Sequence, residues 1–228
     1  MDSLEQNIRQ IQNEIKGKGV TLLAATKTVP AERINRAIDL GIKDIGENRV
    51  QELLDKYDYI NKDGTNIHFI GRLQSNKVKY IIDKVCLIHS LDSLKLAKEI
   101  QKRAQAIGKI QNVLVEVNIA GESSKTGIMP QDVDDFLRSV SAFPNLKVQG
   151  LMCIPPVSSY EGQNIQYFKE IKQMQVDITA KKIDNISMNI LSMGMSADYL
   201  QAIEYGATII RIGSKIFGKR NYNTEELK

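Results

Sequence analysis

The chain has 228 residues, of which 42% are hydrophobic and 25% are charged, so it can bury a substantial core and lacks the composition of a disordered protein. Its net charge of +4 comes from 31 basic and 27 acidic residues that are mixed along the sequence, and without a basic run we expect no nucleic-acid partner. No apolar stretch reaches the roughly 18 residues of a membrane span, and the N-terminus is polar, so we expect a cytoplasmic protein that binds no membrane.

Apolar residues recur at helical spacing from Leu4 to Ile15 and predict an N-terminal helix within residues 1–18. After it, short runs rich in Val, Ile and Leu alternate with amphipathic segments, a pattern typical of parallel strands joined by helices. The last residues, 219–228, are expected to form a flexible tail. The predicted strands cover residues 20–26, 43–46, 67–70, 85–88, 111–117, 147–152, 188–192 and 208–212. The predicted helices between them cover residues 31–41, 48–60, 74–82, 92–107, 131–142, 160–180 and 196–205.

Eight strands with intervening helices predict an α/β fold of the (β/α)8 TIM barrel type. A doubly wound open sheet is the alternative, but no glycine-rich dinucleotide loop follows the first strand. Because the chain has no break in composition and no linker rich in Pro, Gly or Ser, we predict a single domain over residues 1–228.

In such barrels the active site lies at the carboxyl ends of the strands. Lys27 directly follows the first strand, where desolvation would lower its pKa and favour imine formation, although a lysine that reaches out to solvent fits the same position. Ser196, Gly213 and Ser214 follow strands seven and eight, where barrels commonly bind phosphate with a helix N-terminus. The alternative is that Ser196 only caps a helix and the nearby glycines only form turns.

The remaining candidates have simpler interpretations. His68 lies within the third strand and is interpreted as a core histidine, because no second metal ligand stands at a suitable spacing, so no metal is expected. Cys86 and Cys153 are expected to be reduced thiols in or near the core, without an assigned role. Asp198 and Glu204 are expected at the surface, and no nucleophile–base signature such as GxSxG occurs.

Several distinctive motifs occur in a fixed order along the chain. They are ATKTVP, IGENRVQE, IHFIGRLQSNK, HSLDS, VNIAGESSKTGI, GLMCIPP and LSMGMSADYLQAIEYGATIIRIGSKIFG. From the first predicted strand to the last, these segments resemble the pyridoxal phosphate (PLP) homeostasis protein family (YggS/PROSC-like). Two departures are seen, since the family usually has Thr where Ser214 stands and Trp where Ile67 stands; the first keeps a hydroxyl and the second alters only packing.

The resemblance implies a barrel like the N-terminal domain of alanine racemase, the type III PLP fold. It implies that Lys27 carries PLP as a Schiff base and that Asn48 lines the cofactor. It further implies that the phosphate is bound by Ser196, Gly213 and Ser214 and that Arg211 faces the pyridine nitrogen.

Arg211 bears on whether the protein is an enzyme. A guanidinium can only donate hydrogen bonds, so it favours an unprotonated pyridine, which is a weaker electron sink than a pyridinium. Racemases of this fold also add a β-rich domain and a tyrosine from a dimer partner, whereas this chain ends soon after the last predicted strand. We therefore expect a monomeric, non-enzymatic protein for PLP homeostasis, without catalytic residues, that buffers PLP or delivers it to PLP-dependent apoenzymes and influences amino- and keto-acid pools. The alternatives are an amino-acid racemase-like PLP enzyme and a phosphosugar enzyme that uses a lysine imine.

Overall fold

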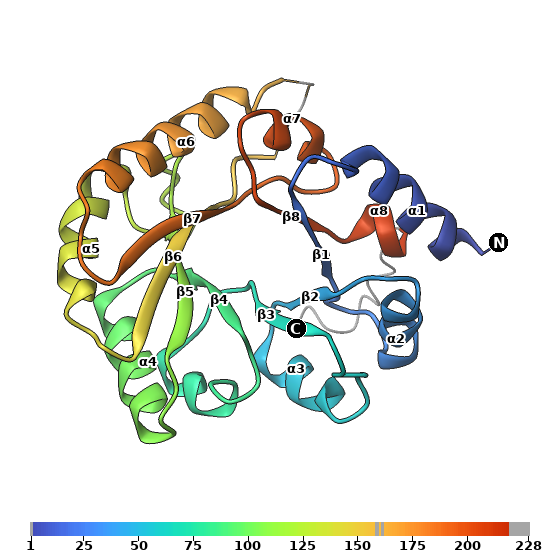
Figure 1. Ribbon diagram of the computed structural model, residues 1–228, viewed down its shortest axis with the longest axis horizontal. Coiled ribbons are helices and arrows are strands. Elements are labelled where there is room, and N and C mark those ends of the chain that lie inside the picture. The colour runs from blue at the N-terminus through green and yellow to red at the C-terminus, as the bar shows by residue number, and fades with distance from the viewer. Residues whose placement is uncertain (1, 158–159, 161, 219–228) are drawn as a thin grey trace.

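The strands form a closed parallel barrel surrounded by helices (Figure 1), which confirms the predicted TIM barrel. The computed structural model describes residues 2–157, 160 and 162–218, so the predicted tail, 219–228, lies outside the described residues. Each strand pairs with the next one along the chain, and β8 closes the ring on β1, for example through Ile210 and Leu22. The strands are β1 (Thr21–Ala25), β2 (Asp44–Glu47), β3 (Asn66–Phe69), β4 (Leu87–Leu91), β5 (Gln111–Val117), β6 (Leu146–Cys153), β7 (Ile186–Ser192) and β8 (Ile209–Ile212).

The helices follow the predicted order with two differences. The segment predicted as a helix over 74–82 is a 3₁₀ helix, η1 (Ser75–Tyr80), and a short helix, α8 (Ser214–Phe217), was not predicted. In the described part of the chain no helix is both long and apolar enough to cross a membrane. The helices are α1 (Ser3–Ile15), α2 (Ala31–Asp39), α3 (Val50–Tyr57), α4 (Leu94–Ala106), η2 (Pro130–Asp132), α5 (Val133–Ser141), α6 (Ile165–Ala180) and α7 (Tyr199–Glu204), besides η1 and α8.

Alternation of side chains along each strand produces two apolar layers. In β1, Leu22 and Ala24 belong to the large core between the sheet and the helices, whereas Leu23 and Ala25 belong to a smaller cluster inside the barrel. The smaller cluster is completed by Ile70, Leu87, Leu114, Met152 and Ile209. Because the apolar cluster inside the barrel is small, the rest of the barrel interior has room for polar side chains.

The N-terminal helix packs beside the end of the barrel sequence. Figure 1 shows α1 next to α8, and the Asn7 side chain donates a hydrogen bond to the Ile216 carbonyl at 3.0 Å. Further along α1, Glu14 accepts a hydrogen bond from the Tyr199 hydroxyl, to which Lys215 Nζ donates at 2.6 Å. These contacts fix α7 and α8, which follow the last two strands, against α1.

Candidate functional site

A cavity of about 590 Å³ opens at the carboxyl ends of the strands. It brings together all six residues for which the sequence predicted a binding role. Among the described residues that line it, the charged ones are Lys27 and Arg211, both cations, so the cavity is suited to an anionic ligand. Its lining consists of Ala25, Lys27, Asn48, Ile70, Ile154, Met195, Ser196, Ala197, Arg211, Gly213 and Ser214.

Lys27 and Asn48 come from neighbouring strand ends. Lys27 follows β1 and is half-buried, while Asn48 follows β2. A Cβ added to Gly71 would lie 2.1 Å from the Asn48 carbonyl oxygen, so only glycine lets the end of β3 pass this close to Asn48. Among the described residues, Asn48 Oδ1 is buried and has no hydrogen-bond partner. An unsatisfied buried acceptor in a cavity wall suits a ligand that donates a hydrogen bond there.

Ser196 lies in the turn after β7, but it does not begin a helix as predicted. The helix begins at Tyr199, and Asp198 occupies the cap position. Asp198 was predicted at the surface, but only 7% of it is exposed, because its carboxylate accepts hydrogen bonds from the Met195 amide at 2.7 Å and from Asn164 Nδ2 at 2.9 Å. Asp198 thus shapes the turn that presents Ser196. Its signal in the sequence is that an aspartate directly before a helical segment is a favoured cap residue.

Gly213 and Ser214 form the start of α8 at the end of β8. Ser196 Oγ accepts a hydrogen bond from the Lys215 backbone amide at 3.3 Å, which joins the β7 turn to this start. Gly194 allows the turn after β7 to pack closely against α7. Its φ is 88°, and a Cβ added to it would lie 2.6 Å from Ala202 Cβ. Two hydroxyls and the first turn of α8 therefore meet at one wall of the cavity, a suitable arrangement for a phosphate group.

Arg211 is held inside the barrel by two hydrogen bonds. Its guanidinium donates to Ser192 Oγ at 2.6 Å and to the Cys153 carbonyl at 2.9 Å. Burial lowers the pKa of Arg211 from its ordinary value, but a guanidinium remains protonated in proteins. The two acceptors belong to the last residues of β7 and β6, so they hold the guanidinium in one position. Arg211 therefore presents a fixed positive charge to the cavity.

A chain of hydrogen bonds continues from Ser192 through the barrel interior. His89 Nδ1 lies 3.0 Å from Ser192 Oγ, His89 Nε2 lies 2.9 Å from His68 Nδ1, and His68 Nε2 lies 3.1 Å from Asp44 Oδ1. The fourth strand was predicted over residues 85–88, but β4 extends to Leu91 and therefore includes His89. His68 lies in the core, as predicted, with 5% of it exposed. Among the described residues, no group of three or more His, Cys, Asp or Glu side chains is placed to hold a metal ion.

The two histidines carry different charges. Burial alone would lower the pKa of His68, but hydrogen bonds to Asp44 and Cys86 outweigh it and raise that pKa to about 9. Burial, together with the charges of His68 and Arg211, lowers the pKa of His89 well below its ordinary value. His68 is therefore the cation that donates to Asp44 and to His89, and neutral His89 donates to Ser192.

This assignment predicts a loss of stability in alkali. A pKa raised from 6.5 to about 9 means that His68 contributes its full stabilisation below pH 6.5 and loses it as the pH rises through 9. The shift corresponds to about 3 kcal/mol, at 1.36 kcal/mol for each pH unit. Urea unfolding at several pH values should show this loss in the wild type and not in His68→Gln; parallel profiles for the two proteins would contradict the assignment.

Both cysteines are free thiols, as predicted. Cys153 is fully buried, and burial raises the pKa of its thiol to about 12, so it is unreactive at neutral pH. Cys86 is half-buried. Ile67 is buried in the large core, in agreement with a packing role for this departure from the family pattern.

The fold and the cavity define a class of protein: a TIM barrel with a cationic pocket at the carboxyl ends of its strands. Residues 1–221 match the family model of the alanine racemase N-terminal domain. The chain is 44% identical over 226 residues to the pyridoxal phosphate homeostasis protein of Aquifex aeolicus, covering 97% of this chain and 98% of that one. It therefore belongs to the pyridoxal phosphate homeostasis protein family, within the alanine racemase N-terminal domain class.

Solved structures agree with this assignment. PipY of Synechococcus elongatus, solved with PLP bound, is 28% identical with a TM-score of 0.86, covering 94% of this chain and all of that one. An alanine racemase of Clostridium difficile shares the fold, with a TM-score of 0.77 at 14% identity, and 58% of its chain is covered by 98% of this one. The racemase likeness therefore concerns the fold alone.

Proposed function

We propose that this protein binds PLP in the strand-end cavity, holds it as a Schiff base on Lys27, and acts in PLP homeostasis by buffering or delivering the cofactor. One observation carries the proposal: a single cavity gathers Lys27 with the two hydroxyls and the backbone of the β7 and β8 ends. The family membership and the PLP-bound relative support it. PLP would supply an aldehyde that condenses with the Lys27 amine.

Each of the six predicted binding residues has a role in this proposal. Lys27 is the amine, and Ser196, Gly213 and Ser214 bind the phosphate by hydroxyl and amide hydrogen bonds. Asn48 offers its unsatisfied Oδ1 as an acceptor to a donor group of the cofactor. Arg211 holds the cofactor in place as a fixed cation and cannot protonate a ring nitrogen that it faces, because it never releases its proton.

The same lining gives little support for catalysis. General acid–base chemistry on a bound amino acid needs groups that exchange protons near neutral pH. Among the described residues that line the cavity, Lys27 is the one titratable side chain besides Arg211, and no carboxylate, histidine, cysteine or tyrosine is present. We infer a non-enzymatic role, with PLP-dependent apoenzymes as candidate recipients of the cofactor and the monomer as the functional form.

The test combines cofactor content with turnover. The protein purified from cells should absorb as a PLP imine and release stoichiometric PLP on alkali treatment, yet it should show no alanine racemisation or transamination above that of free PLP at equal concentration. Turnover well above that of free PLP would support the amino-acid racemase alternative. A protein that lacks PLP and instead binds a phosphosugar would contradict the cofactor assignment.

A further inference from the structure

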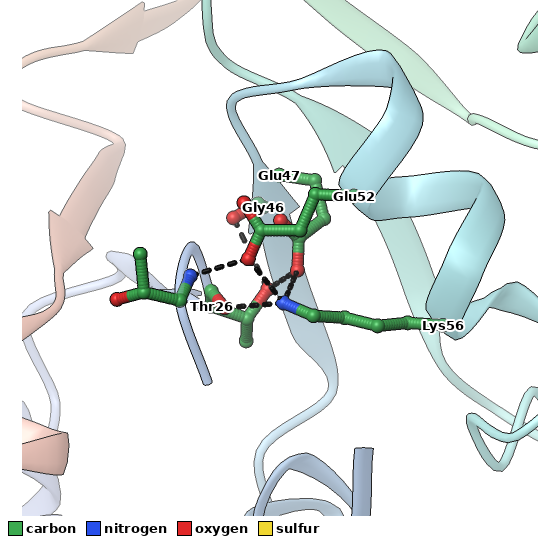
Figure 2. A network of polar contacts seen from close by, with 6 residues as sticks. Thr26, Gly46, Glu47, Glu52 and Lys56 are labelled. Carbon is green, nitrogen blue, oxygen red and sulfur yellow. Dashed lines mark hydrogen bonds and ion pairs between the residues drawn. The ribbon is translucent and has the colours of Figure 1, made fainter. Parts of the chain in front are cut away.

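The backbone on both sides of Lys27 is held by two side chains of α3. Lys56 Nζ donates a hydrogen bond to the Thr26 carbonyl at 3.1 Å, and Glu52 Oε1 accepts one from the Thr28 amide. Figure 2 shows Lys56 reaching from its helix toward Thr26, with Glu52 above it on the same helix. Neither Glu52 nor Lys56 lines the cavity, so any effect they have on a ligand acts through the backbone of residues 26–28.

This segment needs to be held, because Thr28 has a φ of 63°. A β-branched residue in the left-handed region is a steric outlier that persists only when its surroundings impose it. The turn is closed by the Val29 amide, which donates to the Thr26 carbonyl at 3.0 Å, and the Thr28 amide in its middle is directed at Glu52. The carboxylate of Glu52 is therefore the group that accepts the amide exposed by the strained conformation.

Lys56 and Glu52 are themselves fixed by a buried anchor. Glu47, which has no exposed surface, accepts hydrogen bonds from Thr26 Oγ1 at 2.6 Å and from Lys56 Nζ at 3.3 Å. Lys56 Nζ also lies 2.5 Å from Glu52 Oε1, and the side chains of Lys56 and Glu52 are 13% and 18% exposed. An ion pair exposed to solvent at this helical spacing would contribute little to stability. The Lys56–Glu52 pair is largely shielded from solvent, and Lys56 Nζ also donates to the Thr26 carbonyl and to Glu47.

We propose that Glu52 and Lys56, the α3 clamp, are positioning residues that hold residues 26–28 in their strained turn and so direct the Lys27 amine into the cavity. The inference rests on the proposed function of Lys27. The segment from the end of β2 through α3 thus contributes to the site in two ways. It supplies Asn48 to the cavity wall, and it supplies the α3 clamp that holds the backbone beside Lys27.

The first experiment measures equilibrium PLP binding and borohydride-fixed PLP for Glu52→Ala and Glu52→Gln. Loss of a hydrogen bond to a charged group should weaken binding about tenfold to a hundredfold in Glu52→Ala. Glu52→Gln keeps an oxygen acceptor for the Thr28 amide and the same side-chain volume, so it should recover most of the affinity. The matched control is Glu99→Ala, which removes another helical ion pair, with Arg103, that does not line the cavity.

The second experiment separates positioning from general stability. Thr28→Gly makes the left-handed backbone accessible without steric cost, so Glu52→Ala should cause a much smaller loss in that background than in the wild type. In the ligand-free protein, amide hydrogen exchange at Thr28 should accelerate in Glu52→Ala and stay unchanged in Glu99→Ala.

The outcomes are distinguishable. The clamp proposal is overturned if Glu52→Ala binds PLP as the wild type does, or if its loss is equal in the Thr28→Gly background. If Glu52→Ala fails to fold, Glu52→Met in both backgrounds gives the same cycle, because methionine keeps the approximate side-chain volume but cannot accept the Thr28 amide hydrogen bond. A wild type that takes up no PLP at Lys27 overturns the proposed function instead, and hydrogen exchange at Thr28 then still decides whether Glu52 holds the turn.

Discussion

Borohydride treatment of the PLP-loaded protein is expected to fix the cofactor on Lys27, and Lys27→Ala is expected to lose the covalent label completely. The physical reason is geometric, since Lys27 is the one lysine among the described residues that line the cavity. Peptide mapping by mass spectrometry after reduction measures where the label sits. An amine that is held at the cavity by its backbone reacts as an intramolecular partner once the ligand is bound, which is why no other lysine should compete.

The control for this prediction is Lys215→Met. Lys215 directly follows Ser214, but its ammonium is engaged by Tyr199 and Glu14 on the outer side of the barrel. The Lys215→Met variant should therefore retain the full amount of PLP label on Lys27. A label that moves to Lys215 or to any other lysine in the wild type would show that the cavity lysine is not the reactive one.

The barrel could be predicted from the sequence because several strands are short runs rich in Val, Ile and Leu that alternate with amphipathic helical segments. The run that contains Leu22 and Leu23 shows why: a strand buried on both faces is apolar at every position and needs no long-range information to be found. The position of residues at the carboxyl ends of the strands then predicted which of them would meet in the candidate site, because parallel strands all deliver their following residues to one end of the barrel. Lys27 and Arg211 reach the same cavity through this topology.

The parts that could not be predicted depend on contacts between distant segments. Asp198 was wrongly expected at the surface. It is buried because its carboxylate accepts a hydrogen bond from Asn164, a residue 34 positions earlier in the chain, and the local sequence does not reveal this contact. The helix start was placed at Ser196 because a serine before a helical pattern usually caps it, whereas Ser196 binds the Lys215 amide. The left-handed conformation of Thr28 has no sequence signal, since β-branched residues are rare there.

The other large effect concerns the phosphate. Replacing Ser196 and Ser214 together with alanine should weaken the binding of PLP far more than that of pyridoxal, which lacks the anion. Each hydrogen bond to a charged group contributes about 1.5–3 kcal/mol. Two of them correspond to a loss of about a hundredfold to ten thousandfold in PLP affinity, measured by equilibrium titration with both ligands.

The comparison of two ligands is needed because Ser196 also has a structural role. Its hydroxyl accepts the Lys215 amide, so Ser196→Ala will loosen the start of α8 and weaken both ligands by a common factor. The ratio of the two affinities removes that factor and leaves the part due to the anion. Ser139→Ala with Ser141→Ala, which deletes two hydroxyls that bond only within α5, should leave the ratio unchanged. An equal loss for PLP and pyridoxal in the Ser196 and Ser214 variant would mean that the two hydroxyls support the fold of this wall and do not bind the phosphate.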